Sequence, residues 1–447
     1  MKETPRRSRA GVLRMGTLFC LTLLLSVAPS TPGHVSGRAD AAPAPGLRDL
    51  AAPLGLRIGA AFNDDPTLLD PSYATTLARE FDMGVSENHM KWQFVHPAPT
   101  TYDFKVADAQ VGFAEGHGMT YRGHNLAWSR QNPAWLVTGP FTRDERIQQL
   151  RDHIAAVVGH YAGRVAQWDV VNEAFDGLAD PLHDPWSVSI GFPEYLDIAF
   201  TAAHAADPTA KLFYNDYNLQ APNSKFDHLI DLVAGMKARG VPIDGIGFES
   251  HLSARSCTAK CTNDTLKNML RAHALGLEVA ITELDVSVQL PATSQKLDQQ
   301  ASVYRSVLEA CLLAPNCHTF MMWGFTDKYS WIPSFVHGYG AALPFDEQYQ
   351  PKPAYAAMAA TLSTPPVAPS CAAFPDRATA QKAFDSGVLG APMLDPDGSG
   401  TACENLPAVA APVAAPATVE PAPTGEKLPA VPAPRAAPVV VAPAFTG

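Results

Sequence analysis

Trp168-Asp-Val-Val-Asn-Glu-Ala174 and Ile281-Thr-Glu-Leu-Asp285 are the two stretches that decide the fold. Each places a glutamate, Glu173 or Glu283, at the C-terminal end of a short apolar run that we predict to be a buried parallel strand. A buried strand has no structural need for a carboxylate at its end. In a (β/α)8 barrel, functional side chains gather at the face where the strands pass into loops. The two stretches therefore predict a parallel barrel with two acidic groups on one face.

The chain from about Leu56 to Ala359 repeats this pattern, because short apolar runs alternate with amphipathic helical stretches. We predict strands at Leu56–Ala61, Met83–Glu87, Thr120–His124, Val165–Val171, Lys211–Asn215, Gly245–Ser250, Glu278–Thr282 and Thr319–Trp323. Polar or aromatic residues end most of these runs. Strand–helix units repeated over about 300 residues predict the α/β class, with a (β/α)8 TIM barrel over residues 47–362.

Residues 1–41 are predicted to be a secretory signal peptide. Arginines at 6, 7, 9 and 14 precede the apolar stretch Met15–Ala28, and a region of small residues follows it. The Arg6-Arg7 pair is compatible with general or twin-arginine export. No later segment reaches the roughly 18 apolar residues that a membrane span needs. We therefore expect a secreted, extracellular protein without a membrane span.

The composition after residue 362 changes. We interpret residues 363–370 as a Pro-rich linker, 371–405 as a small cysteine-bounded module, and 406–447 as a low-complexity Ala/Pro/Val tail. Six cysteines follow the signal peptide, an even number that fits disulfides in an exported chain. Short loop closure favours Cys257–Cys261, Cys311–Cys317 and Cys371–Cys403, although sequence alone leaves the connectivity open. The net charge of −11 argues against a nucleic-acid partner and suits a neutral polymer.

Several motifs occur in order along the predicted barrel. They are Ser86-Glu-Asn-His-Met-Lys-Trp92, Arg122-Gly-His-Asn-Leu-Ala-Trp128, Asn215-Asp-Tyr-Asn218, Ser250-His251, Trp323-Gly-Phe-Thr-Asp-Lys-Tyr-Ser-Trp331 and Lys352-Pro-Ala-Tyr355. Together with the two glutamate segments they resemble glycoside hydrolase family 10, the family of endo-1,4-β-xylanases. The resemblance covers about residues 50–360.

This resemblance implies a role for each candidate residue. Glu173 is the expected acid/base and Glu283 the expected nucleophile, with His251 and Asp285 orienting Glu283. The residues expected to bind sugar are Glu87, Asn88, Lys91, His124, Trp128, Asn172, Tyr217, Glu249, Trp323 and Trp331. Aromatic rings match the CH faces of a sugar, and planar polar groups match its hydroxyl edges.

The chain departs from the family pattern at two positions. Ser129 stands where the family usually has histidine, and Glu249 stands where it usually has glutamine. Glu249 is two residues before His251, so it lies on the same side of the strand and brings a third carboxylate close to Glu283. We expect the pKa of Glu249 to be raised, because neighbouring carboxylates resist carrying two charges.

The module at 371–405 resembles an excalibur-type calcium-binding module. Asp395, Asp397, Ser399 and Glu404 match its acidic loop, with Ser399 in place of an expected aspartate. Oxygen groups of this kind suit a calcium ion. A disulfide-closed turn without metal is the alternative interpretation.

The sequence therefore predicts a secreted, monomeric, retaining endo-1,4-β-xylanase that needs no cofactor for catalysis and acts on xylan or a related β-1,4-glycan. Two alternatives remain open at this point. One is a related retaining β-glycanase acting on another β-glycan. The other is an inactive, cell-wall-associated glycan-binding protein, which the presence of both Glu173 and Glu283 disfavours.

Overall fold

The computed structural model describes residues 44–63, 70–177, 180–182, 184–256 and 260–408. The predicted signal peptide and nearly all of the predicted tail lie outside these residues. Within them, no helix is both long and apolar enough to cross a bilayer.

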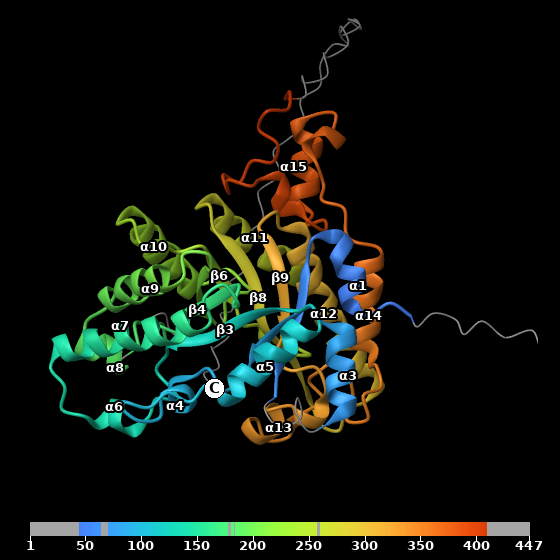
Figure 1. Ribbon diagram of the computed structural model, residues 1–447. Helices are drawn as coiled ribbons and strands as arrows, with labels where there is room; N and C mark the ends of the chain where they lie inside the picture. Colours follow the sequence, from blue (N-terminus) through green and yellow to red (C-terminus); the bar gives the residue numbers. More distant parts are fainter. Residues whose placement is uncertain (1–43, 64–69, 178–179, 183, 257–259, 409–447) are drawn as a thin grey trace, which may run out of the picture. The chain divides into compact units, whose positions relative to one another are not determined.

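Parallel strands form a closed barrel at the centre of the molecule (Figure 1). They are β1 (Arg57–Phe62), β2 (Met83–Ser86), β3 (Thr120–Ala127), β4 (Gln167–Asn172), β5 (Lys211–Asp216), β6 (Gly245–Phe248), β8 (Glu278–Gln289) and β9 (Cys317–Met322). Each strand pairs in parallel with its neighbours, and β9 pairs with β1 to close the ring. The (β/α)8 TIM barrel predicted from the sequence is confirmed.

Long helices follow the strands and surround the barrel (Figure 1). They are α3 (Pro71–Glu80), α5 (Lys105–Gly116), α7 (Arg143–His160), α9 (Glu194–Ala206), α10 (Ser224–Ala238), α11 (Cys261–Ala274), α12 (Ser294–Leu313) and α14 (Pro353–Ser363). Local sequence fixes where several begin. Thr142 and Glu145 form a capping box at α7, and the Asp70 carboxylate accepts backbone N–H bonds at the start of α3.

Shorter helices complete the described chain. They are α1 (Leu47–Ala51), η1 (Ala52–Leu54), α4 (Trp92–Val95), α6 (Ala134–Thr138), α8 (Pro185–Ser189), η2 (Asp327–Tyr329), α13 (Ile332–Phe335), η3 (Cys371–Ala373), α15 (Arg377–Asp385) and η4 (Ala391–Leu394).

The seventh predicted strand, Glu278–Thr282, is too short. β8 continues to Gln289, so Glu283 lies inside a strand and not at its end. The extension has two partners of its own: β7 (His251–Ser253) pairs with it in parallel and β10 (Tyr339–Gly340) in antiparallel fashion. The sixth predicted strand, Gly245–Ser250, is too long. It ends at Phe248, because Ser250 adopts φ 65° and turns the chain before β7 begins.

Two glycines allow close packing inside the barrel. A Cβ on Gly123 would lie 2.1 Å from the Trp168 ring, and a Cβ on Gly247 would lie 2.1 Å from Asn215 Oδ1. Both positions therefore need glycine if Trp168 and Asn215 are to keep their places.

Disulfides close two short segments near the C-terminal end. Cys311–Cys317 joins the end of α12 to the start of β9, and Cys371–Cys403 closes the small module. Inside that module, Ala380, Leu394 and Ala402 form a small apolar cluster. The predicted Cys257–Cys261 pairing includes Cys257, which lies outside the described residues.

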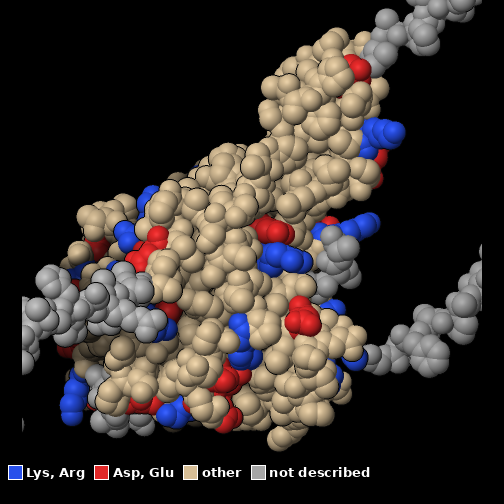
Figure 2. All heavy atoms as spheres, turned by 90° about the vertical axis from the view of Figure 1, so that its right-hand side faces the viewer, with Lys and Arg blue, Asp and Glu red and all other residues tan. Residues whose placement is uncertain are grey.

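Charged side chains are scattered over the face of the molecule in Figure 2. On that face the basic and acidic residues are interspersed with uncharged surface between them. A single-sign stripe of the kind that binds a polyanion is not present among the described residues of this face.

Candidate active site

Glu173 follows directly after β4 and takes a left-handed backbone conformation, with φ 51°. Its N–H donates to the Asn215 carbonyl oxygen at 2.9 Å, which ties it to the end of β5. Burial and the negative charge of Glu283 raise the pKa of Glu173, and the charges of Arg130 and His251 oppose the shift. A raised pKa keeps a proton on the carboxyl group, which a general acid requires.

Glu283 is buried in β8, with 5% of its surface exposed. Its Oε1 accepts a hydrogen bond from Asn215 Nδ2 at 2.8 Å, and its Oε2 lies 3.2 Å from His251 Nε2. Burial alone would raise its pKa. The charges of His124 and His251 outweigh burial, so the pKa of Glu283 is lowered. Two carboxyl groups on one face thus have pKa values shifted in opposite directions, which separates an acid from a nucleophile.

His251 bridges Glu283 and Asp285. Its Nδ1 lies 3.0 Å from Asp285 Oδ2, and the Trp331 indole N–H donates to the same oxygen at 2.7 Å. Burial alone would lower the pKa of His251, but the charges and hydrogen bonds of Asp285 and Glu283 raise it to about 10. A cationic imidazole beside Glu283 favours the ionised carboxylate.

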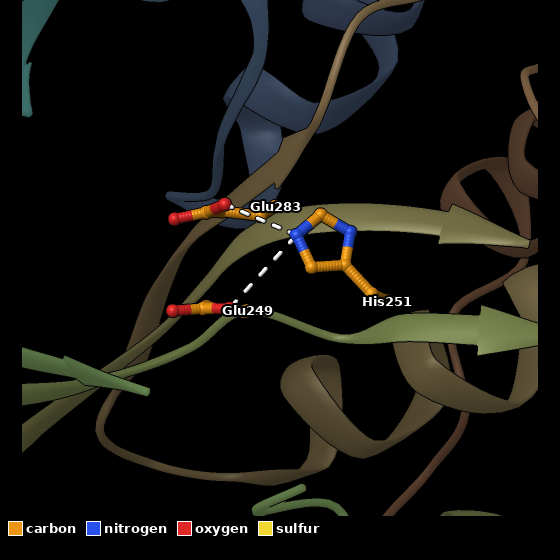
Figure 3. A group of neighbouring side chains, drawn as sticks. All are labelled: Glu249, His251 and Glu283. Atoms are coloured by element: carbon orange, nitrogen blue, oxygen red, sulfur yellow. Dashed lines mark hydrogen bonds and ion pairs between the residues drawn. The ribbon is translucent and has the colours of Figure 1, made fainter. Parts of the chain in front are cut away.

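Glu249 follows β6 and lies close to both Glu283 and His251, with 2% of its surface exposed. Its Oε2 is 3.9 Å from His251 Nε2 (Figure 3). Burial, followed by the charges of Glu283 and Glu173, raises its pKa well above the ordinary value for a glutamate. Glu249 does not reach this place by alternation along one strand, because β6 ends at Phe248 and Ser250 turns the chain before His251.

Lys91 lies between two tryptophan rings. Its Nζ is 5.0 Å from the centre of the Trp128 ring and 5.6 Å from that of Trp323. No hydrogen bond from Nζ to another described residue is present. Burial lowers the pKa of Lys91, and the carboxylates of Glu283 and Glu87 oppose this. A buried ammonium group between aromatic faces is well suited to donate to hydroxyls of a sugar.

His124 belongs to a buried ion network that the sequence did not reveal. Its Nδ1 lies 3.1 Å from Asp169 Oδ2 and 3.7 Å from Glu283 Oε1. Arg122 holds both oxygens of Asp169. Burial alone would raise the pKa of Asp169, but Arg122 and His124 keep it below the ordinary value. The pair Arg122 and Asp169 therefore fixes the imidazole that faces Glu283.

Asn215 is a further site residue that the sequence does not reveal. It belongs to the motif Asn215-Asp-Tyr-Asn218, but nothing in that motif indicates its bridging role. Its Nδ2 donates to Asn172 Oδ1 at 2.7 Å as well as to Glu283. Thr282 Oγ1 donates to Asn215 Oδ1 at 2.7 Å and fixes the amide orientation. Asn172 in turn donates to Glu173 Oε1 at 3.3 Å, so a series of hydrogen bonds connects Glu173 with Glu283.

The remaining predicted sugar-binding residues lie on the same face. Asn63 donates to Glu87 Oε2 at 2.8 Å, and Gln131 donates to Asn88 Oδ1 at 3.3 Å. Tyr217 lies on the β5 side, with the Lys225 ammonium 3.4 Å from its ring centre.

A buried ion pair lies beneath Tyr217. Lys225 Nζ is 2.6 Å from Asp216 Oδ1, and Tyr214 donates its hydroxyl to Asp216 Oδ2 at 2.7 Å. Lys225 and Asp216 are 3% and 0% exposed in their side chains. Burial raises the pKa of Asp216 to about 7, although Lys225 and Tyr214 oppose it.

The four predicted calcium ligands are brought together around Ser399. The Ser399 hydroxyl donates to Glu404 Oε1 at 2.8 Å and lies 3.2 Å from Asp395 Oδ1. The Ser399 backbone N–H reaches Asp395 Oδ1 at 3.0 Å and Asp397 Oδ1 at 3.2 Å. Oxygen donors therefore cluster in one loop, and this donor set fits the preference of calcium.

Comparison with known proteins agrees with this arrangement. The profile of Glycosyl hydrolase family 10 matches residues 46–361. The chain is 42% identical to endo-1,4-beta-xylanase B of Thermotoga neapolitana over 315 residues, 70% of this chain and 90% of the relative. It is 38% identical to endo-1,4-beta-xylanase C of Phanerodontia chrysosporium over 71% of this chain and 79% of the relative.

Solved structures give the same result. Xylanase 10B from Thermotoga maritima superposes with a TM-score of 0.69 at 40% identity, covering 71% of this chain and 98% of that protein. Xylanase 10B from Thermotoga petrophila, solved in complex with xylobiose, has the same score and identity over 71% and 97%. The chain therefore belongs to glycosyl hydrolase family 10.

Proposed function

We propose that the protein is a retaining endo-1,4-β-xylanase that cleaves internal bonds of xylan. The observation that carries this proposal is the pair Glu173 and Glu283, whose pKa values are shifted in opposite directions on one face of a family 10 barrel. Relatives named as xylanases, including one solved with xylobiose, support xylan as the substrate.

The first half of the reaction uses the two groups together. Ionised Glu283 attacks the anomeric carbon while Glu173 donates its proton to the leaving oxygen, and a glycosyl ester forms on Glu283. His251 and Asn215 hold the two carboxylate oxygens of Glu283, so attack requires little movement of this group.

The second half reverses the role of Glu173. Once it has lost its proton, it serves as the base that activates water, and water then hydrolyses the ester with retained configuration. The loss of negative charge from Glu283 in the ester removes one cause of the raised pKa of Glu173. With its pKa lowered, Glu173 is ionised at this stage and can accept a proton from the attacking water. No cofactor takes part in these steps.

The substrate is tested by product analysis on xylan, mixed-linkage glucan and cellulose. Preferential release of xylo-oligosaccharides from xylan is expected. Preference for a glucan would favour a related β-glycanase, and binding without hydrolysis would favour an inactive glycan-binding protein.

The mechanism is tested by NMR of the first product and by azide rescue. The first product should keep the β-configuration. Glu283→Ala with azide should give a glycosyl azide of inverted configuration, and Glu173→Ala should give one of retained configuration. An initially inverted product would contradict the retaining mechanism, and a swapped rescue pattern would reverse the two roles.

Three further properties are proposed on the same basis. Residues 1–41 direct export, so the mature enzyme is secreted, extracellular and monomeric. The module at 371–405 is an excalibur-like unit in which Asp395, Asp397, Ser399 and Glu404 hold calcium without taking part in catalysis. Detection of the mature N-terminus in culture medium, light scattering, and calcium titration of the full chain test these in turn.

A further inference from the structure

Three possible ligand atoms surround a point beside the nucleophile. Glu249, His251 and Glu283 each offer one, and these atoms all lie within 4.8 Å of one another (Figure 3). His251 Nε2 is 3.2 Å from Glu283 Oε2 and 3.9 Å from Glu249 Oε2. Two ligands bound to a tetrahedral zinc ion at about 2.1 Å would stand about 3.4 Å apart, and the two observed distances bracket that value.

Glu249 is a buried carboxylate whose oxygens are poorly satisfied. Its Oε1 has a contact of 3.4 Å with Asn215 Nδ2, but the two amide hydrogens of Asn215 already serve Asn172 at 2.7 Å and Glu283 at 2.8 Å. Among the described residues, none donates a hydrogen bond to Glu249 Oε2, which faces His251 Nε2. A buried carboxylate in this state gains free energy from a proton or a cation.

His251 is held in the orientation that metal-binding histidines use. Its Nδ1 pairs with Asp285 Oδ2 at 3.0 Å, which leaves Nε2 directed at the two glutamates. Trp331 fixes that Asp285 oxygen from the other side at 2.7 Å. A carboxylate on the far nitrogen of a histidine sets its tautomer and strengthens its binding to a metal ion.

We propose that Glu249, His251 and Glu283 form an inhibitory site for a divalent transition-metal ion, with zinc as the best match. One imidazole and two carboxylates are a donor set that zinc accepts in three-ligand sites, with water in the fourth position. Calcium and magnesium prefer all-oxygen sites, so they bind less well here.

The ion blocks catalysis by occupying the nucleophile. Zinc accepts one lone pair each from Glu283 Oε2, Glu249 Oε2 and His251 Nε2. The N–H bond of His251 Nε2 and the O–H bond of protonated Glu249 break, and both protons leave to solvent. No electron is transferred. A sugar in the cleft and the ion both need Glu283, so inhibition is competitive. Because these protons must be displaced, we expect binding to release protons to the buffer and to weaken as the pH falls.

Glu249 supplies the third ligand of the site, and its charge is essential to that role. A glutamine at this position would keep the size of the side chain but replace an anionic oxygen with a neutral amide. Glu249→Gln is therefore the matched test variant, because it removes a ligand without a cavity.

The test measures binding and inhibition separately on the full chain. Calorimetric titration with zinc chloride compares the wild type with Glu249→Gln and with Glu173→Gln, which keeps all three ligands. His160→Ala removes a surface histidine that pairs with Asp108 at 2.8 Å, and it controls for zinc bound elsewhere. We expect Glu249→Gln to weaken the site at least tenfold, and the other two variants to bind zinc as the wild type does.

Inhibition is measured on an aryl β-xylobioside, with each active variant compared with its own metal-free rate. Competitive inhibition of the wild type, at least tenfold weaker in Glu249→Gln, is expected. Equal zinc affinity in the wild type and Glu249→Gln would overturn the inference, as would noncompetitive inhibition or equal inhibition by magnesium. The inference rests on the proposed function only for the inhibition measurement. Zinc binding that depends on Glu249 in a protein inactive on xylan would reject the proposed function and leave the metal site standing.

Discussion

Lys225→Met should destabilise the barrel strongly, because it leaves Asp216 buried without its cation. The two groups are 2.6 Å apart and almost fully enclosed. Removing one partner of such a pair costs about 3–5 kcal/mol. For the matched barrel at residues 46–361, an unfolding entropy of about 2.1 cal/mol/K per residue converts this into a Tm lower by about 5–8 °C.

The effect should depend on pH in a defined direction. The pKa of Asp216 is raised from 3.8 to about 7, so rising pH between these values removes stability from the wild type. Without Lys225 the pKa of folded Asp216 rises further, so the variant continues to lose stability as the pH rises above 7. The Tm deficit of Lys225→Met should therefore be larger at pH 8 than at pH 5.

Thermal unfolding followed by circular dichroism at both pH values provides the measurement. The double variant Asp216→Asn with Lys225→Met has no buried charge at either position and should regain most of the lost Tm. A Tm within 2 °C of wild type for the single variant at pH 8 would refute the reasoning. A double variant no more stable than the single one would do the same.

Three other outcomes are expected. Gly247→Ala should lower kcat/KM by on the order of 100-fold, because the new Cβ would lie 2.1 Å from Asn215 Oδ1 and would push that side chain out of place. The control Gly159→Ala, where a Cβ meets no atom within 4 Å, should change the rate little. Steady-state kinetics of both variants measures the difference. In Glu173→Gln, kcat/KM on aryl xylosides with good leaving groups should no longer fall at alkaline pH, because loss of the proton from Glu173 causes that fall in the wild type. A fall that persists in the variant would assign it to another group. Chelation of calcium should speed proteolysis of residues 371–405 without changing xylan hydrolysis, and equal proteolysis with and without chelator would favour a metal-free turn.

The sequence was most informative where charge interrupts an apolar run. Glu173 and Glu283 could be recognised because a carboxylate at the end of a short apolar run has no role in packing. The barrel could also be predicted, because the alternating strand and helix patterns are local properties of the chain.

Features that depend on distant partners could not be predicted in this way. The length of β8 depends on β7, about 30 residues before it, and on β10, about 50 residues after it. Lys225 looks like a solvated helix lysine in the sequence, and only the packing of α10 against the end of β5 buries it beside Asp216. Asn215 shows its bridging role only where β4, β5 and β8 converge.

The extension of β8 gives the two glutamates different mechanical settings. Glu283 lies within a strand whose continuation is paired on both sides, by β7 and by β10. Glu173 lies just past a strand end, at a single left-handed residue. The residue that carries the sugar through the covalent stage is thereby held inside a strand that stays hydrogen-bonded beyond it. The residue that serves first a departing sugar and then an incoming water lies where β4 passes into its loop, with one backbone hydrogen bond to Asn215. The backbone thus places the group that bonds to the sugar inside a strand, and the group that exchanges protons at the start of a loop.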